Sequence, residues 1–138
     1  KPVGEYHVGI CTNTLCAVMG GDVIFDAVKE HLEIENDGVT ADGKVSVEHI
    51  ECNAACDYAP VVMVNWEFYD NQTVQSVKDL VDGARNGNPP APTRGPKTLR
   101  TWKQNSAVLA GISDGLANEG VQAGGPTLLG LMKAKGGA

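Results

Sequence analysis

Four cysteines, arranged as two close pairs, constrain this chain more than any other feature of its sequence. Four residues separate Cys11 from Cys16, three separate Cys52 from Cys56, and 35 lie between the two pairs. The chain shows no apolar signal-peptide core, so we expect a reducing compartment. There, spaced cysteines more often bind metal or perform redox chemistry than form structural disulfides. The spacing therefore predicts a metal or redox site.

The segments around the cysteines predict an α/β fold. Four segments show the apolar pattern of strands, and two show the apolar stripe of helices. The strands are expected at 5–10, 45–51, 61–64 and 66–69, and the helices at 15–32 and, capped by Thr73, at 74–84. The predicted order is β-α-β followed by β-β-α.

The pair Gly20-Gly21 interrupts the first predicted helix. Either the helix restarts at Asp22, which is a good N-cap residue, or the missing side chains let the backbone pass close to another group. The sequence leaves both alternatives open.

The two cysteine pairs should meet at one edge of the predicted sheet. Each pair follows one of the first two strands, which are joined through a helix, as parallel strands require. Parallel strands place their carboxyl ends at the same edge, where ligands bind in open α/β sheets. Four thiolates are the ligand set of a 2Fe–2S cluster, two for each iron. We therefore expect one such cluster, with Cys11, Cys16, Cys52 and Cys56 as its metal ligands. Cys16 should lie in a first helical turn, where the dipole favours thiolate.

Other interpretations of the cysteines remain open. A zinc-stabilised interaction domain without a redox role would use the same ligand set, because zinc pairs are often separated by two to four residues. Two disulfides are a weaker alternative, and neither pair has the Cys-x-x-Cys spacing of a thioredoxin-type catalyst. The chain has no phosphate loop and no Gly-x-Gly-x-x-Gly motif, so we expect it to bind neither nucleotide nor flavin itself. Spacing and topology favour iron–sulfur over zinc.

Charge and composition divide the chain into three parts. Residues 1–85, the expected cluster domain, hold 15 acidic and 5 basic side chains, whereas residues 86–138 hold 2 and 6. The acidic body argues against nucleic acid as a partner. Residues 86–97 form a Pro/Gly-rich linker. Residues 98–138 are expected to form an irregular extension that docks on a partner subunit. No apolar run is long enough to predict a membrane span.

Three motifs resemble the thioredoxin-like 2Fe–2S subunit of bacterial NADH:quinone oxidoreductase, which is the E subunit of respiratory complex I. They are Cys11-Thr12-Asn13-Thr14-Leu15-Cys16, Gly20-Gly21 and Glu51-Cys52-Asn53-Ala54-Ala55-Cys56-Asp57-Tyr58-Ala59-Pro60. The resemblance covers about residues 5–85. It implies a thioredoxin-like ferredoxin fold with a mixed four-stranded sheet, cluster ligation by all four cysteines, and a cis peptide bond before Pro60. Two departures are the absence of a helical region before the first strand and a segment, 86–138, that matches no general pattern of the family.

The resemblance also implies a function. The chain would be a subunit of the proton-translocating NADH dehydrogenase, with no catalytic residues of its own, and would exchange one electron with FMN in the adjacent subunit. That F-type subunit would bind FMN and NADH, and the large iron–sulfur G-type subunit would be a second neighbour. The expected location is the peripheral arm, on the cytoplasmic side of the bacterial plasma membrane and without direct membrane insertion. The equivalent diaphorase subunit of an NAD-linked hydrogenase or formate dehydrogenase is the alternative.

Overall fold

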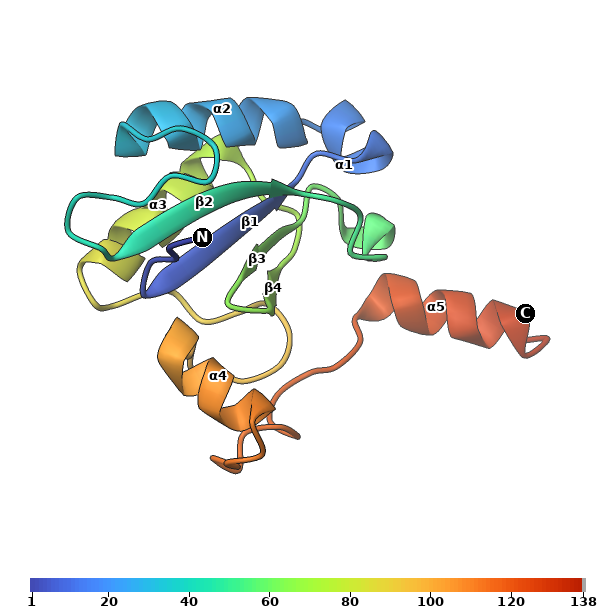
Figure 1. The fold of residues 1–138 in the computed structure, drawn as a ribbon. Helices are drawn as coiled ribbons and strands as arrows, with labels where there is room; N and C mark the ends of the chain where they lie inside the picture. Colours follow the sequence, from blue (N-terminus) through green and yellow to red (C-terminus); the bar gives the residue numbers. More distant parts are fainter. Residues whose placement is uncertain (138) are drawn as a thin grey trace.

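A four-stranded sheet forms the centre of the chain, of which the computed structural model describes residues 1–137 (Figure 1). Its strands are β1 (Tyr6–Cys11), β2 (Val45–Ile50), β3 (Val62–Val64) and β4 (Glu67–Tyr69), in the spatial order β2-β1-β3-β4. β1 and β2 are parallel, whereas β3 runs antiparallel to both β1 and β4. The predicted mixed sheet and its order of elements are confirmed.

Two helices, α2 (Gly21–Leu32) and α3 (Val74–Arg85), cover one face of this sheet. The strands send alternate side chains toward them: Val8 of β1 pairs with Val47 of β2 and with Val64 of β3, and all three are fully buried. Burying side chains of this size stabilises the fold by about 1.5 to 3 kcal/mol each. Among the described residues, no such pair of helices covers the other face of the sheet. That face lines the groove described below.

The helix expected at 15–32 is two helices, α1 (Thr14–Val18) and α2. Gly20 caps α2 with a φ of 111°, a left-handed conformation that glycine adopts at little cost. The helix therefore does restart here, as one of the two alternatives proposed, but its cap is Gly20 and not Asp22. Asp22 lies in the first turn instead, where its charge suits the positive end of the helix dipole. α3 begins as predicted, because the Thr73 hydroxyl accepts a hydrogen bond from the Ser76 amide.

Residues 86–137 first pack against the sheet and then extend away from it, ending in a projecting helix (Figure 1). Residues 86–101 contain no helix or strand; α4 (Trp102–Leu109) and α5 (Gly125–Ala134) follow, separated by another irregular stretch. Leu99 precedes α4 and is buried in the main core. Within residues 1–137, no helix combines the length and apolar character needed to cross a membrane.

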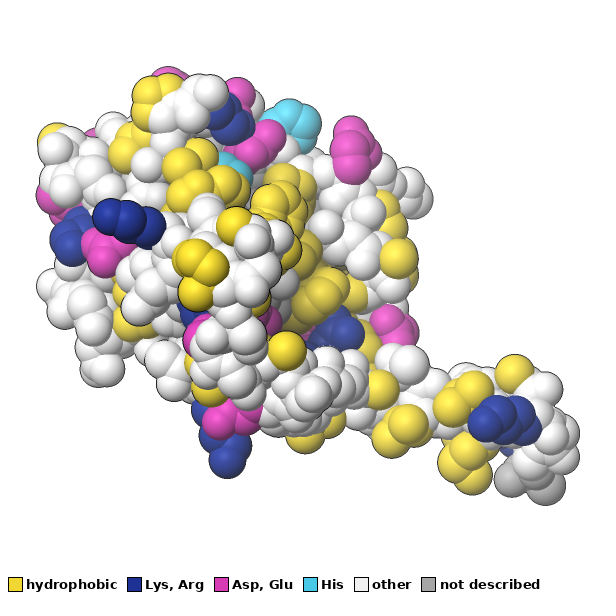
Figure 2. Space-filling view, turned by 60° about the horizontal axis from the view of Figure 1, so that its bottom comes forward, with side chains coloured by type: hydrophobic (Ala, Val, Ile, Leu, Met, Phe, Trp, Pro, Cys, Tyr) yellow, Lys and Arg dark blue, Asp and Glu magenta, His cyan; other side chains and the backbone are white. Residues whose placement is uncertain are grey.

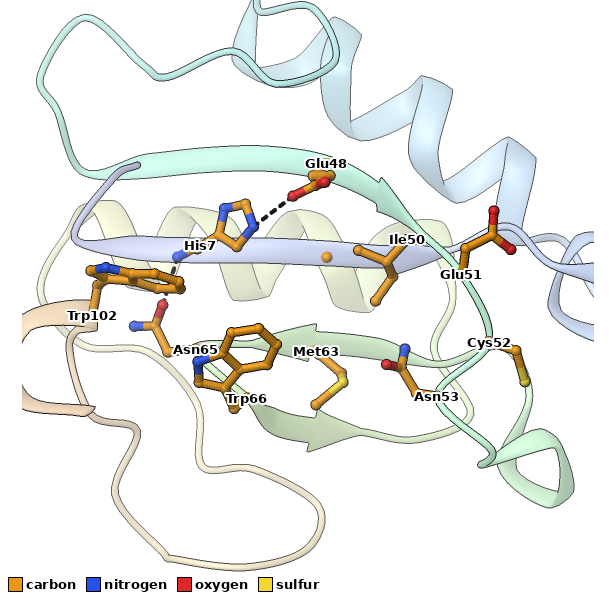
Figure 3. Close-up of a pocket in the computed structure, with 11 residues that line it drawn as sticks. His7, Glu48, Ile50, Glu51, Cys52, Asn53, Met63, Asn65, Trp66 and Trp102 are labelled. Carbon is orange, nitrogen blue, oxygen red and sulfur yellow. Dashed lines mark hydrogen bonds and ion pairs between the residues drawn. The ribbon is translucent and has the colours of Figure 1, made fainter. Parts of the chain in front are cut away.

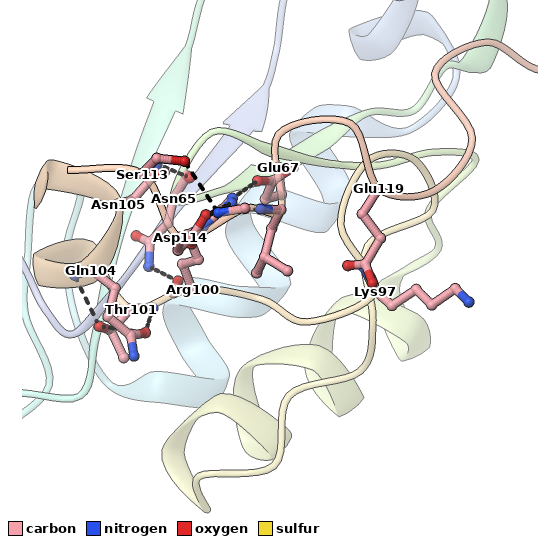
Figure 4. Close-up of polar contacts among 12 residues, drawn as sticks. Asn65, Glu67, Lys97, Arg100, Thr101, Gln104, Asn105, Ser113, Asp114 and Glu119 are labelled. Atoms are coloured by element: carbon pink, nitrogen blue, oxygen red, sulfur yellow. Dashed lines mark hydrogen bonds and ion pairs between the residues drawn. The ribbon is translucent and has the colours of Figure 1, made fainter. Parts of the chain in front are cut away.

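Arg100 joins the extension to the sheet (Figure 4). Its guanidinium is 7% exposed and donates to Glu67 of β4 at 3.1 Å and to Asp114 of the extension at 2.5 and 2.9 Å. Its backbone carbonyl accepts from the buried Asn65 amide at 2.8 Å, and Asn105 of α4 donates to the Asn65 carbonyl. The hydrogen bond from Arg100 lowers the pKa of Asp114 to about 2, whereas burial raises the pKa of Glu67.

Replacing Arg100 with Met should loosen the extension. The change leaves the half-buried Glu67 carboxylate without its cation, so we expect the free energy of unfolding to fall by about 1 to 3 kcal/mol. Chemical denaturation measures that loss, and limited proteolysis should cut residues 98–124 faster. Arg85→Met is the control: its pair with Asp42 is about 40% exposed on both sides, so it should change stability by about 0.5 kcal/mol or less. Equal effects of the two substitutions would contradict a structural role for Arg100.

Candidate metal centre

The four cysteines converge where β1 and β2 end. Cys11 is the last residue of β1 and pairs with Ile50, the last residue of β2. Cys52 follows β2 in a loop, Cys56 begins the short 3-10 helix η1 (Cys56–Tyr58), and Cys16 is the third residue of α1. The Cys52 and Cys56 sulfurs are 3.5 Å apart, and the Cys16 thiol lies within hydrogen-bonding reach of Cys11. The two pairs are close enough that a negative charge on Cys56 raises the pKa of Cys16.

The two pairs differ in their exposure to solvent. Cys11 and Cys16 are 2% and 3% exposed and pack with Ala55 and Tyr58 in a small apolar cluster apart from the main core. Cys52 and Cys56 are exposed. One half of the site is therefore part of the protein interior, while the other half forms its surface.

Backbone amides support the sulfurs on both sides. Ala54 adopts a left-handed φ of 54° and donates its N–H to the Cys52 sulfur at 3.3 Å. On the buried side, a hydrogen bond with the Val61 backbone amide lowers the pKa of Cys16 and so opposes the effect of burial. The sequence analysis missed Val61, because nothing in a run of valines indicates that one amide faces a sulfur 45 positions earlier.

The helix dipole does not dominate at Cys16. Burial, together with the hydrogen bond to Cys11, raises the pKa of the Cys16 thiol to about 11. Cys16 lies in the first turn of α1, as expected, but burial affects its pKa more strongly than the dipole of this five-residue helix does. The hydrogen bond with Cys52 likewise raises the pKa of Cys56. Both groups are thiols at neutral pH, so binding a metal here must release protons.

Gly21 sets the distance between α2 and the buried cysteines. A Cβ at this position would lie 2.4 Å from the Cys11 carbonyl oxygen and 2.9 Å from that of Cys16. Close passage of the backbone, the second alternative for Gly20-Gly21, is observed at Gly21, and the group that lies close is the cysteine backbone. Glycine is thus required at Gly21 because α2 begins directly against the site.

The donor set suits a centre with two metal ions. Two thiolates bound to one tetrahedral ion lie about 3.8 Å apart, given metal–sulfur bonds of about 2.3 Å. The 3.5 Å between Cys52 and Cys56 matches that spacing. Among residues 1–137, no group of three or more Cys, His, Asp or Glu side chains is placed to hold one ion. Cys11 with Cys16 and Cys52 with Cys56 form two such pairs, and a 2Fe–2S cluster takes two thiolates for each iron.

A groove of about 280 Å³ reaches this edge from the uncovered face of the sheet (Figure 3). Gly9 forms part of the floor of the groove, where a side chain would not fit. A Cβ at this position would lie 2.9 Å from the Ile50 side chain. Cys52 and Asn53 line one end, and the Asn53 side-chain nitrogen is buried with no hydrogen-bond partner among the described residues. His7 also lines the groove, but it bonds to Glu48 at 3.0 Å and contacts no cysteine.

A mixed β-α-β and β-β-α sheet with four cysteines at its parallel edge defines a thioredoxin-like iron–sulfur protein. The peptide bond between Ala59 and Pro60 is cis, as the resemblance implied. Residues 1–85 match the family of thioredoxin-like 2Fe-2S ferredoxins, and the chain belongs to that family.

Relatives of the chain come from two kinds of enzyme complex. It is 60% identical over 136 residues to the E subunit of NADH-quinone oxidoreductase from Mycobacterium tuberculosis, a match that covers 98% of this chain and 54% of the relative. It is 39% identical over 80 residues to the NADP-reducing hydrogenase subunit HndA of Solidesulfovibrio fructosivorans, covering 58% of this chain and 47% of that one. The chain thus spans about half the length of the curated relatives it matches.

A solved structure shares the fold. An NAD+-reducing NiFe hydrogenase chain superposes with a TM-score of 0.60 over 64% of this chain and 16% of that chain, at 17% identity. The match supports the thioredoxin-like architecture that the strand order defines.

Gly21→Ala should damage the site. The added methyl group must displace the Cys11 or Cys16 backbone, so we expect a loss of about 1 to 3 kcal/mol in the free energy of unfolding, and loss of bound iron. Denaturation curves and iron analysis measure both. Gly130→Ala in α5 is the control, because a Cβ there meets nothing within 4 Å and alanine favours the helix. Full iron content in the Gly21 variant would refute the close-passage argument.

The cysteine pairs should differ in reactivity when no metal is bound. We expect iodoacetamide at pH 8 to alkylate Cys52 and Cys56 roughly tenfold or more faster than Cys11 and Cys16, because the latter are buried. Mass spectrometry of timed digests gives the four rates, and circular dichroism verifies that the protein stays folded. In 6 M guanidinium the rates should become equal. Uniform rates in the folded protein would mean that the buried pair is not protected.

Proposed function

We propose that this chain is the 2Fe–2S electron-transfer subunit of the NADH-oxidising module of NADH:quinone oxidoreductase, complex I. The observation that carries the proposal is the arrangement of the cysteines as one buried and one exposed pair at the edge of a thioredoxin-like sheet. The similarity to the mycobacterial NADH-quinone oxidoreductase relative, which extends over 98% of the chain, supports the choice of complex.

In this proposal the four cysteines have two roles. Cys11 and Cys16 hold one iron within the apolar cluster, where water is excluded, and Cys52 and Cys56 hold the other at the surface. The bound cluster supplies a site that accepts and returns one electron. The Ala54 amide, which donates to Cys52 at 3.3 Å, stabilises negative charge on the exposed sulfur.

The proposed partners supply the flavin and nucleotide binding for which this chain has no sequence motif. The chain has no phosphate-binding loop, so FMN and NADH belong to the adjacent F-type subunit, with which the cluster exchanges one electron. The large G-type iron–sulfur subunit is the second proposed neighbour, in the peripheral arm on the cytoplasmic side of the plasma membrane. Residues 1–85 are the cluster domain, 86–97 the linker, and 98–138 an extension that docks on a partner subunit.

A second candidate is the diaphorase subunit of an NAD-linked hydrogenase or formate dehydrogenase. The similarity to a hydrogenase subunit favours it, because the cluster domain is common to both kinds of complex. The subunits that copurify separate the two: proton-pumping membrane subunits support complex I, and a nickel or molybdenum subunit supports the alternative. A zinc-stabilised interaction domain is the candidate from another class, but it requires all four sulfurs around one ion rather than in two pairs.

Metal analysis and electron paramagnetic resonance test the cluster. The purified chain should contain about two irons and two sulfides and give a 2Fe–2S signal after dithionite reduction. Cys56→Ser should weaken or shift the signal, whereas Asp57→Asn, one residue away, should keep it. A colourless protein with one zinc would falsify the proposal.

A further inference from the structure

Helix α5 projects from the body and exposes an apolar stripe (Figures 1 and 2). Leu128, Leu131 and Met132 have the i, i+3, i+4 spacing of one helix face, and they are 48%, 50% and 56% exposed. Leu129 beside them is 55% exposed. Four large apolar side chains on ten residues form a continuous patch, and contiguous patches of this kind mark interaction sites.

The base of α5 is attached next to the exposed cysteines. The Thr127 hydroxyl donates to the Asp57 carboxylate at 2.8 Å and lies 3.2 Å from the Tyr58 hydroxyl. Gly124 packs directly on Tyr58, since a Cβ there would lie 2.4 Å from the Tyr58 oxygen. Both contacts are with η1, which begins at Cys56. The direction of α5 is therefore set at the surface through which the exposed iron would exchange electrons.

The helix is also positively charged on an acidic protein. From Val121 to the last described residue the chain contains Lys133 and Lys135 and no acidic residue, whereas residues 1–85 hold 15 acidic side chains. Both lysines lie at the carboxyl end of α5, where cations complement the helix dipole. A surface that receives this helix would have carboxylates at the position facing its carboxyl end.

A ten-residue helix needs an external surface to be stable. Isolated helices shorter than about 12 residues are marginal in water, and α5 contains glycines at both Gly125 and Gly130. It is also about half as long as a membrane span, which takes about 20 residues. An amphipathic helix of this length suits an apolar groove on another protein.

We infer that α5 is a docking arm for the protein that exchanges electrons with the exposed cysteine pair. The arm lays Leu128, Leu131 and Met132 into an apolar groove of that protein, and Lys133 and Lys135 meet carboxylates at the end of the groove. Because α5 starts at η1, the same contact holds the partner's redox group beside Cys52 and Cys56. This inference rests on the proposed function, since it takes the flavin- and NADH-binding subunit as the partner.

The test measures binding of the full chain, with its cluster, to the purified flavin- and NADH-binding subunit from the same organism. The variant Leu128→Ser/Leu131→Ser/Met132→Ser removes the stripe; Val18→Ser/Val23→Ser/Leu109→Ser removes three other exposed apolar residues, located on α1, α2 and α4. We expect the stripe variant to bind at least about tenfold more weakly and the control to bind as the unaltered chain does. Both should keep the iron content and resonance spectrum of the unaltered protein, since every changed side chain is about half exposed or more.

Charge reversal tests the second part of the inference. Lys133→Glu/Lys135→Glu should weaken binding and reduce its dependence on salt, whereas Lys103→Glu on α4 should have little effect. NADH-driven reduction of the cluster should slow in parallel with binding in both α5 variants.

The outcomes separate the arm from the proposed function. Unchanged affinity in the stripe variant overturns the arm and leaves the cluster and its partner intact. Failure of the unaltered, cluster-containing chain to bind the flavin subunit overturns both the partner and the arm, while iron analysis still tests the cluster alone. Stripe-dependent self-association in analytical ultracentrifugation, or stripe-dependent binding to phosphatidylglycerol vesicles, would assign α5 to another occupant and reject the inference.

Discussion

The parallel pairing of β1 with β2 is the interaction on which the site depends. It places Cys11 opposite Ile50, so two segments about 40 residues apart in the chain end at the same edge. Without this pairing the two cysteine pairs would be separate dithiols. Since the pairing exists only in the folded chain, cluster binding and folding must support one another.

The connection between the two strands completes the buried half of the site. The chain leaves β1, turns through α1, and begins α2 directly against the Cys11 and Cys16 carbonyls, where only glycine fits. Burial of Cys16 in the apolar cluster with Ala55 and Tyr58 raises the pKa of its thiol. The exposed half has the opposite design, with Cys52 and Cys56 on a loop that can face another protein. A cluster between the halves would be protected on one side and accessible on the other.

The extension is attached to the domain at two points, and the second lies on the side of the exposed cysteines. The buried Arg100 anchors its first part to β4 through an ion pair with Glu67, and Thr127 anchors its last helix to η1 beside the exposed cysteines. The domain to which these anchors attach is acidic, whereas the helix after the second anchor is basic and apolar. The contacts explain how the irregular stretch between α4 and α5 can still hold α5 in a defined direction.

The sequence by itself determined the strands, the cap at Thr73, the family and the meeting of the four cysteines, because periodicity, capping and parallel connection are local or topological rules. Only the tertiary structure decided that Cys16 is buried and that its pKa is raised, because desolvation depends on neighbours that are distant in sequence, such as Ala55 and Tyr58. It also decided that Gly20 caps a new helix and that Gly21 allows close packing, because both depend on the position of the backbone in space. The extension was predicted least well, since Arg100 and α5 are positioned by long-range polar contacts that leave no periodic pattern in the sequence.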